Sequence, residues 1–353
     1  MLCMASTGNG LVDTKFDSMV DNESGSQRSY IGLANISVGP CKEQLRGLTM
    51  YHGQLLALFW WEINAVTRNV RLTLVQMRDA GSENSCCDAA VKWIELAAQQ
   101  GANIVCLQEL FAGPYPCQTE DHRMFDLAES ISGPTVDRLT EVARRLQVVI
   151  VAPIFERRAP GVYHNTAVVI DADGTLAGKY RKMHIPDDPL FYEKFYFTPG
   201  DCGFQPIETK YAKLGVGICW DQWFPEAARL FALAGAEILL YPTAIGWIDD
   251  EKEQFGDGQH DAWMTSMRAH AISNGVFLGA PNRVGIEGRL EFWGSSFIAS
   301  PRGEVMAKGN HSDDCLVTAD CALDELDLVR THWPFLRDRR IDAYEGLLKR
   351  WID

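Results

Sequence analysis

Apolar residues follow two patterns along the chain after residue 69, and these patterns predict alternating strands and helices. Val70–Gln76 alternates apolar and polar side chains and is rich in β-branched residues, which is typical of a strand. Asp88–Gln100 has apolar residues at helical spacing and is followed by Gly101, which indicates a helix end. Further predicted strands lie at 102–107, 148–154, 167–170, 214–219, 238–241, 276–280, 295–299 and 304–307, and further predicted helices at 135–146, 225–234 and 262–274.

The order of these elements indicates the class of fold. Strands and helices alternate, but Asp171–Gly174 and Pro301–Gly303 are typical of the turns that join neighbouring strands directly. A layered α/β fold with mixed sheets is therefore favoured over a purely parallel sheet. Because no long linker interrupts the pattern, we expect residues 68–353 to form one domain.

Residues 1–67 have a different composition from the rest of the chain. Met1–Gln27 is rich in Ser, Gly, Asn and Asp and has little periodicity, so we expect this N-terminal extension to be partly disordered. Gln54–Trp61 is an apolar patch within it, and it is either a short docking helix or an appendage without a catalytic part. Met1–Asn35 lacks a basic segment followed by an apolar core, which favours a cytoplasmic protein.

Charge and composition exclude several classes of protein. The chain has 33 basic and 47 acidic residues and a formal net charge of -14, which argues against a nucleic-acid-binding protein. No apolar run approaches the roughly 18 residues that a transmembrane helix needs, so no membrane partner is expected. The ten cysteines have no regular spacing and the eight histidines no metal-ligand spacing, so we predict reduced thiols and no metal site.

Three polar residues follow apolar strand-like segments and are candidate catalytic residues. Cys219 lies between a predicted strand and a predicted helix, where backbone N–H groups stabilise a thiolate or an oxyanion, although a buried structural cysteine fits the pattern equally well. Glu109 follows a core strand, where a carboxylate is paired, acts as a base or is solvated. Lys182 lies between a strand and a proline-containing loop, and a lone lysine there is ordinarily a solvated surface residue.

Five segments, taken in this order, carry motifs that resemble a known family. They are 108–111 (QELF), 180–186 (YRKMHIP), 193–197 (EKFYF), 217–229 (GICWDQWFPEAAR) and 241–246 (YPTAIG). The chain from about Val70 to its C-terminus resembles the nitrilase superfamily of carbon–nitrogen hydrolases, and within it the N-carbamoylputrescine amidohydrolases. This resemblance implies a four-layer αββα sandwich with mixed sheets. It also implies a homo-oligomer, a dimer or larger, that pairs through the cysteine-bearing helix region or through Trp333–Arg340.

The resemblance implies a role for each candidate. Cys219 corresponds to the nucleophile, Glu109 to the base and acid, and Lys182 to an electrostatic stabiliser, while Glu193 matches a second carboxylate that orients the others. The implied reaction converts N-carbamoylputrescine into putrescine, carbon dioxide and ammonia through a cysteine carbamoyl thioester, in polyamine biosynthesis. It requires no metal and no organic cofactor. A non-catalytic binding scaffold is disfavoured because Glu109, Lys182 and Cys219, the three residues of the implied catalytic triad, are all present.

The substrate pocket is predicted from residue chemistry. A carbamoylated diamine ends in an ammonium group, which needs apolar walls and an acidic residue at the far end of its pocket. The predicted walls are Tyr115, Trp220 and Trp247, and Ala244 is a further predicted substrate-binding residue. The residues predicted to supply charge are Asp249, Asp250 and Glu251. A charge run of this kind is otherwise a solvated loop. The alternative substrates are a carbamoyl amino acid, such as N-carbamoyl-β-alanine, or an ω-amide, and Arg283 or Arg289 would then bind a carboxylate tail.

Overall fold

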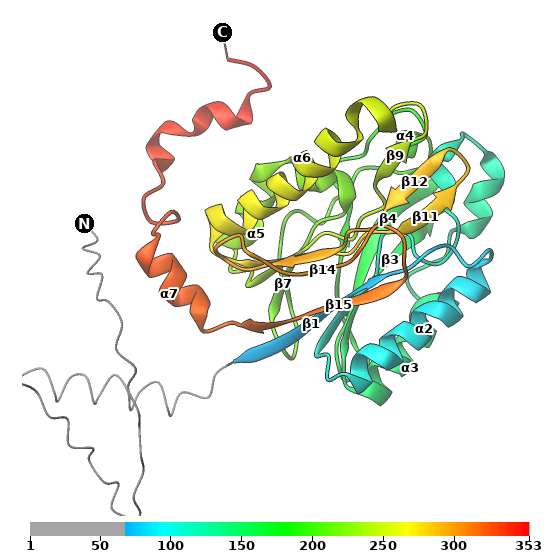
Figure 1. Ribbon diagram of the computed structural model, residues 1–353, viewed down its shortest axis with the longest axis horizontal. Helices are drawn as coiled ribbons and strands as arrows, with labels where there is room; N and C mark the ends of the chain where they lie inside the picture. The colour runs from blue at the N-terminus through cyan, green and yellow to red at the C-terminus, as the bar shows by residue number, and fades with distance from the viewer. Residues whose placement is uncertain (1–67, 353) are drawn as a thin grey trace, which may run out of the picture. The chain divides into compact units, whose positions relative to one another are not determined.

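The computed structural model describes residues 68–352 (Figure 1). The predicted extension at residues 1–67, with its apolar patch Gln54–Trp61, lies outside the described residues. Among residues 68–352, no helix has the length and apolar character that a bilayer-spanning segment needs.

Two six-stranded sheets form the centre of the fold. The first has the order β15 (Cys315–Ala322), β1 (Asn69–Gln76), β2 (Ile104–Cys106), β3 (Val149–Ala159), β4 (Val162–Ile170) and β5 (Leu176–Arg181). The second has the order β14 (Val305–Lys308), β13 (Phe297–Ala299), β10 (Phe277–Ala280), β8 (Ile238–Leu240), β7 (Lys213–Val216) and β6 (Ile207–Glu208). Both sheets mix parallel pairs, such as β1 with β2, and antiparallel pairs, such as β3 with β4.

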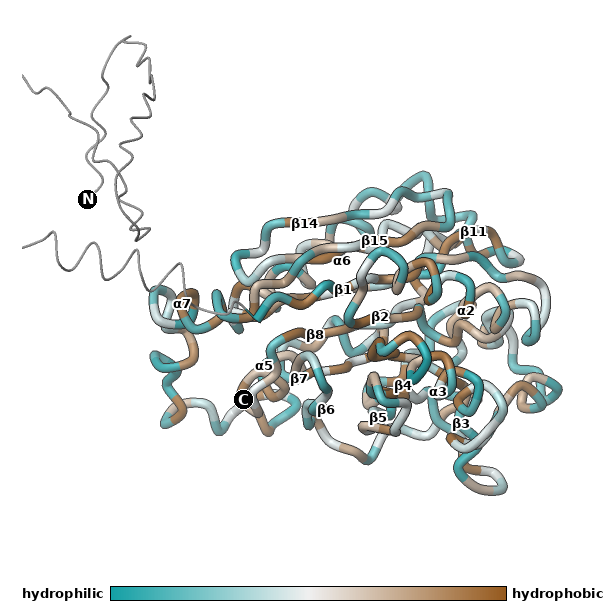
Figure 2. The backbone as a smooth tube through the Cα atoms, turned by 90° about the horizontal axis from the view of Figure 1, so that it is seen from below, coloured by the Kyte–Doolittle hydropathy of each residue, from teal (hydrophilic) through white to brown (hydrophobic). Residues whose placement is uncertain are grey.

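Helices cover the outer face of each sheet. Residues of α2 (Glu83–Gln99) and α3 (Pro134–Leu146) pack on one face of the first sheet, through Ile94 and Leu139. Residues of α5 (Pro225–Leu233) and α6 (Lys252–Asn274) pack on the second sheet, through Phe231 and Trp263. Between the sheets, apolar strand residues meet in one core, and Figure 2 shows this apolar interior along β1, β2 and β8. The predicted αββα sandwich with mixed sheets is therefore confirmed.

Smaller elements complete the described chain. A three-stranded sheet has the order β11 (Val284–Glu287), β12 (Leu290–Trp293) and β9 (Gly246–Ile248). The short helices are η2 (Pro116–Gln118), η3 (His122–Leu127), α4 (Glu193–Tyr196), η4 (Cys219–Trp223), α7 (Glu325–His332), η5 (Ile341–Ala343) and η6 (Glu345–Leu348). Gly246 is required in β9 because a Cβ there would collide with the backbone of Glu291 in β12.

Several predicted boundaries were wrong. Away from the site described below, α2 begins at Glu83 and not at Asp88, β3 continues to Ala159 and β4 begins at Val162. Two further errors concern the site. The helix predicted from residue 262 begins at Lys252, because its first turns carry polar side chains and lack the apolar periodicity that marked the rest. The strand predicted over 214–219 ends at Val216, and Cys219 instead begins the 3₁₀ helix η4. The sheet formed by β9, β11 and β12 was not predicted, because its short strands are only partly buried and lack the continuous apolar runs of β2 and β8.

Candidate active site

The three polar residues singled out in the sequence come together in the fold. Glu109 lies beyond the end of β2, Lys182 directly follows β5, and Cys219 lies beyond the end of β7. Glu109 and Lys182 thus extend from the first sheet and Cys219 from the second. All three are buried, and their residue exposures are 0%, 1% and 5%.

Lys182 lies between two buried carboxylates. Its Nζ donates to Oε1 of Glu109 at 2.8 Å and to Oε2 of Glu193 at 2.6 Å. Glu193 is the first residue of α4, and its other oxygen accepts a hydrogen bond from the hydroxyl of Tyr115 at 2.8 Å. Burial opposes the charge on Lys182, but the two carboxylates outweigh it and raise the pKa of the ammonium well above its usual range. Lys182 is therefore a fixed positive charge.

Backbone and amide groups fix the orientation of Glu109. Asn165 of β4 donates from Nδ2 to Oε1 of Glu109 at 2.7 Å, and the N–H of Ala244 donates to Oε2 at 2.9 Å. Charge-assisted hydrogen bonds of this length hold a carboxylate in one rotamer. Asn165 was not predicted, although a polar amide within an apolar strand was a signal that could have identified it.

Cys219 has an unusual backbone conformation. Its φ is 42°, in the left-handed region that a residue with a Cβ rarely occupies, and its N–H donates to the carbonyl of Pro242 at 2.9 Å. Burial, followed by the nearby Glu109 carboxylate, raises the pKa of the Cys219 thiol well above its usual range, while Lys182 opposes this effect. The resting group is therefore a thiol, and a neighbouring base must remove its proton before it can act as a nucleophile.

A third buried carboxylate supports the turn that carries Cys219. Asp221 accepts hydrogen bonds from the N–H of Ile218 at 2.9 Å and from the hydroxyl of Tyr180 at 2.9 Å. It also lies 2.6 Å from Nδ1 of His184, whose ring stacks on Phe224. Asp221 thereby joins the Cys219 turn to the loop that follows Lys182. Sequence analysis did not identify this network.

Arg283 holds the loop that follows Glu109. Its guanidinium is fully buried, donates to the carbonyls of Leu110 at 2.7 Å and Gly113 at 3.0 Å, and pairs with Glu287 at 2.7 Å. Leu110 has a φ of 47°, so these bonds stabilise a strained turn. Both terminal nitrogens of Arg283 are therefore engaged by the protein itself, whereas its Nε is buried without a partner among the described residues. Arg283 does not line the cavity at Cys219.

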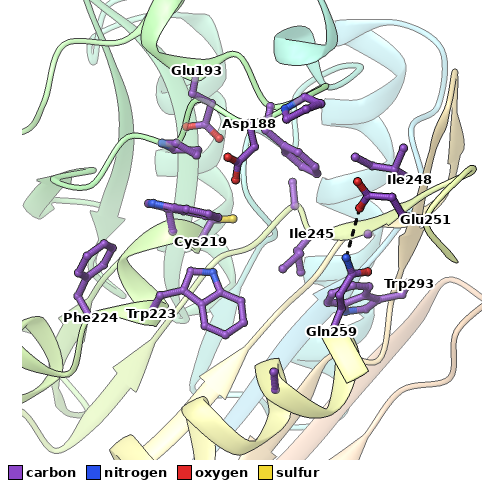
Figure 3. Close-up of a pocket in the computed structure, with 17 residues that line it drawn as sticks. Asp188, Glu193, Cys219, Trp223, Phe224, Ile245, Ile248, Glu251, Gln259 and Trp293 are labelled. Carbon is purple, nitrogen blue, oxygen red and sulfur yellow. Dashed lines mark hydrogen bonds between the residues drawn. The ribbon is translucent and has the colours of Figure 1, made fainter. Parts of the chain in front are cut away.

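A cavity of about 530 Å³ opens at Cys219 (Figure 3). Its walls are mainly apolar, and the lining residues are Pro186, Asp188, Pro189, Phe191, Glu193, Cys219, Trp220, Trp223, Phe224, Ala244, Ile245, Gly246, Ile248, Glu251, Gln259, Ala262 and Trp293. Three of them are carboxylates, and none of these lining residues is Arg, Lys or His. A site of this size and character fits a small organic substrate. Within the described residues no group of three or more His, Cys, Asp or Glu side chains is arranged to hold a metal ion.

The structure separates the predicted substrate-binding residues into three groups. Trp220 and Ala244 line the cavity. Tyr115 lies behind it and contacts Glu193, and Trp247 lies behind it and donates from Nε1 to the carbonyl of Gly256 at 3.0 Å. Asp249 and Asp250 are outside the lining and form exposed ion pairs with Arg289 at 2.7 and 2.8 Å.

Comparison with known proteins agrees with this fold. Residues 71–331 match the carbon-nitrogen hydrolase family. A protein of Oryza sativa subsp. japonica named N-carbamoylputrescine amidase is 45% identical over 79% of this chain and 94% of its own length. A citrullinase of Francisella tularensis is 40% identical over 80% of this chain and 99% of its own length. The crystal structure of a carbon-nitrogen hydrolase from Helicobacter pylori G27 superposes with a TM-score of 0.78 at 46% identity, covering 80% of this chain and 100% of that one.

The chain belongs to the carbon-nitrogen hydrolase family. Members of this family are hydrolases, so the buried cluster and the cavity next to it belong to an enzyme.

Proposed function

We propose that this protein hydrolyses N-carbamoylputrescine to putrescine, carbon dioxide and ammonia, as a step in polyamine biosynthesis. The observation that supports this substrate is the charge of the cavity at Cys219. None of its lining residues is basic, and of its three carboxylates Glu193 is paired with Lys182, while Asp188 and Glu251 have no ion pair within residues 68–352. An ammonium tail is attracted to such a cavity, whereas a carboxylate tail is repelled. The similarity to the rice N-carbamoylputrescine amidase supports the same substrate.

The cluster geometry supports a mechanism with four catalytic residues. Glu109 removes the thiol proton of Cys219, and the thiolate attacks the ureido carbon to form a tetrahedral oxyanion. The Lys182 ammonium and the backbone N–H of Trp220 stabilise this charge, and one oxyanion donor contributes roughly 3–4 kcal/mol in other hydrolases. Glu193 keeps Lys182 protonated and oriented, at 2.6 Å from its Nζ.

The intermediate then breaks down in two steps. Glu109 returns the proton to the leaving nitrogen, the C–N bond breaks, and ammonia departs from a carbamoyl thioester on Cys219. Glu109 next removes a proton from water, and the resulting hydroxide attacks the thioester carbon. The C–S bond then breaks, and Glu109 returns its proton to the departing thiolate of Cys219. The released carbamate of putrescine decomposes to carbon dioxide and the free diamine.

The competing substrates all carry a carboxylate. A carbamoyl amino acid, citrulline or an ω-amide of a dicarboxylic acid needs a cation at the far end of the pocket. Arg283 is engaged by Glu287 and two carbonyls, and Arg289 pairs with Asp249 and Asp250 outside the cavity. The structure therefore favours the amine over the carboxylate tail.

A substrate panel tests this proposal. Ammonia release is measured with N-carbamoylputrescine, N-carbamoyl-β-alanine, citrulline, glutamine and an aliphatic nitrile, for the wild type and for Cys219→Ser. We expect the highest kcat/KM for N-carbamoylputrescine and no turnover by the variant, because serine is a much poorer nucleophile without a strong base. A preference for any carboxylate-bearing substrate, or more than about a tenth of the activity in the variant, would contradict the proposal.

We also propose that two copies of the chain associate through α5 and the C-terminal segment 333–352. Leu230 and Leu233 of α5 are exposed, and the C-terminal segment exposes Trp333, Phe335, Ile341, Tyr344, Leu347, Leu348, Trp351 and Ile352. Figure 1 shows this segment extending away from the sheets after α7. An apolar surface of this extent is typical of an interface between subunits. A monomeric mass by light scattering at micromolar concentration would contradict the dimer.

The cytoplasmic location expected from the sequence stays a prediction.

A further inference from the structure

The cavity contains carboxylates at two different positions. Figure 3 shows Asp188 close to Glu193, on the side where Cys219 lies, and Glu251 with Gln259 on the opposite side. The chemistry takes place at Cys219, so the tail of an extended substrate reaches the opposite side. Glu251 and Gln259 are therefore the polar groups that meet the end of the substrate.

The start of α6 positions Glu251. This residue directly precedes Lys252, the first residue of α6, and its N–H donates to the carbonyl of Ile248 at 3.1 Å. Neighbouring carboxylates in this corner have cationic partners, since Asp249 and Asp250 pair with Arg289 and Glu291 pairs with Lys252 at 2.6 Å. Glu251, which is half-buried, forms no ion pair within residues 68–352. It thus presents a charge to the cavity that the described protein does not neutralise.

Gln259 contributes a second acceptor. It lies about two helical turns after Glu251, on the same side of α6, and its Nε2 is 3.4 Å from Oε2 of Glu251. This contact orients the amide with its nitrogen toward the carboxylate. Its Oε1 is buried and has no hydrogen-bond partner in the described part of the chain. A buried amide oxygen without a donor is unfavourable, so this atom needs a ligand that donates.

A primary ammonium group matches these requirements. It carries a positive charge and three N–H donors and has no acceptor. One donor can reach Glu251, a second can reach Oε1 of Gln259, and Ile248 and Trp293 line the same part of the cavity for the methylene groups. A methyl end would leave both acceptors without a donor, and a carboxylate end would be repelled by Glu251.

We propose that Glu251 and Gln259 form the subsite that binds the terminal ammonium of a carbamoylated diamine, and therefore determine substrate specificity. This inference rests on the proposed function, because it assumes that the ureido group reacts at Cys219. It narrows the prediction made on the sequence, which had Asp249, Asp250 and Glu251 supply the charge, to Glu251.

Two substrates that differ only at the tail test the subsite. Pentylurea has the same ureido group and chain as N-carbamoylputrescine, with a methyl group in place of the ammonium. We expect Glu251→Gln to lower kcat/KM for N-carbamoylputrescine by about 30-fold, which is the effect of losing about 2 kcal/mol, and to change kcat/KM for pentylurea by less than about threefold. Gln259→Met should likewise lower kcat/KM for N-carbamoylputrescine and not for pentylurea. We expect a loss of about fivefold, since this variant removes a neutral acceptor.

Matched variants separate the subsite from its surroundings. Glu253→Gln removes an exposed carboxylate two residues from Glu251 and outside the cavity. It should leave kcat/KM unchanged for both substrates. The double variant Asp249→Asn with Asp250→Asn should also have little effect on the difference in kcat/KM between the two substrates, since neither residue lines the cavity. A large selective loss in this double variant, equal losses for both substrates in Glu251→Gln, or no loss there would overturn the assignment.

The wild-type enzyme distinguishes this failure from failure of the proposed function. If wild type prefers N-carbamoylputrescine over pentylurea and Glu251→Gln keeps that preference, the assignment of the subsite is wrong, whereas the proposed substrate is correct. If wild type shows no preference for the charged tail, or turns over a carboxylate-bearing substrate faster, the proposed function itself is wrong.

Discussion

Two clusters in this molecule each consist of one basic side chain between two carboxylates, at nearly the same distances. Lys182 lies 2.8 and 2.6 Å from Glu109 and Glu193, and Arg289 lies 2.7 and 2.8 Å from Asp249 and Asp250. Their environments differ, because the side chains of the first cluster are at most 1% exposed and those of the second are 52% exposed or more. Distance alone therefore does not distinguish the proposed catalytic cluster from a surface one.

Burial changes what each ion pair does. In the exposed cluster, water and salt screen the charges, so the pairs contribute little to stability. In the buried cluster the charges cannot be solvated, so removing one partner leaves the others uncompensated. The same low dielectric makes Lys182 effective against a negative charge that develops beside it.

Replacing the buried cation gives the largest expected effect. Lys182→Ala leaves the carboxylates of Glu109 and Glu193 without a counter-ion, which costs about 3–5 kcal/mol in other buried ion pairs. The variant should also lose kcat by more than about a hundredfold with a smaller change in KM, because the charge that Lys182 meets exists mainly in the transition state. Urea unfolding and steady-state kinetics measure the two effects. A change confined to KM would argue against an electrostatic role in the reaction.

Asp221 tests whether a buried carboxylate outside the catalytic cluster behaves in the same way. Asp221→Asn keeps the shape but weakens the acceptors for Ile218 and Tyr180, so we expect a loss of about 1–3 kcal/mol in stability. Since this network supports the strained φ of Cys219, kcat should fall as well. His184→Ala removes one contact of the same network and should give a smaller loss in kcat. Full activity in Asp221→Asn would show that the turn is held by other contacts.

The comparison also explains which features could be predicted from the sequence. Strand ends followed by polar residues, together with family motifs, were sufficient for Glu109, Lys182 and Cys219, because strand order brings such residues together. The residues at the far end of the cavity were less predictable, because their positions depend on where α6 begins and on which carboxylates Arg289 neutralises. Asp249, Asp250 and Glu251 are adjacent and chemically similar, and only packing shows that Glu251 alone among them lines the cavity.

The pH dependence of stability should differ between the two clusters. Burial, with a contribution from the Glu109 carboxylate, raises the pKa of Glu193 from 4.5 to about 7, although Lys182 opposes this shift. The folded protein therefore binds this proton more tightly than the unfolded chain does. The resulting stability is fully present below pH 4.5 and is lost as the pH rises through about 7.

Glu193→Gln isolates this contribution, because glutamine does not titrate. Relative to the variant, wild type should lose stability between pH 4.5 and about 7 and then remain level. Urea midpoints of the two proteins, measured across this window, give the difference directly. A constant difference would mean that Glu193 keeps its charge throughout.

Replacing the exposed cation should have the smallest effect and completes the comparison. Arg289→Gln removes both exposed pairs, but Asp249 and Asp250 are already solvated and remain so. We expect an unchanged Tm at physiological salt and an unchanged kcat/KM for N-carbamoylputrescine, since none of the three residues lines the cavity. At low ionic strength, where screening is weaker, a small loss of Tm should become measurable. A large fall in kcat/KM with an unchanged Tm would mean that this corner contacts the substrate, and that the exposed cluster resembles the buried one in function as well as in geometry.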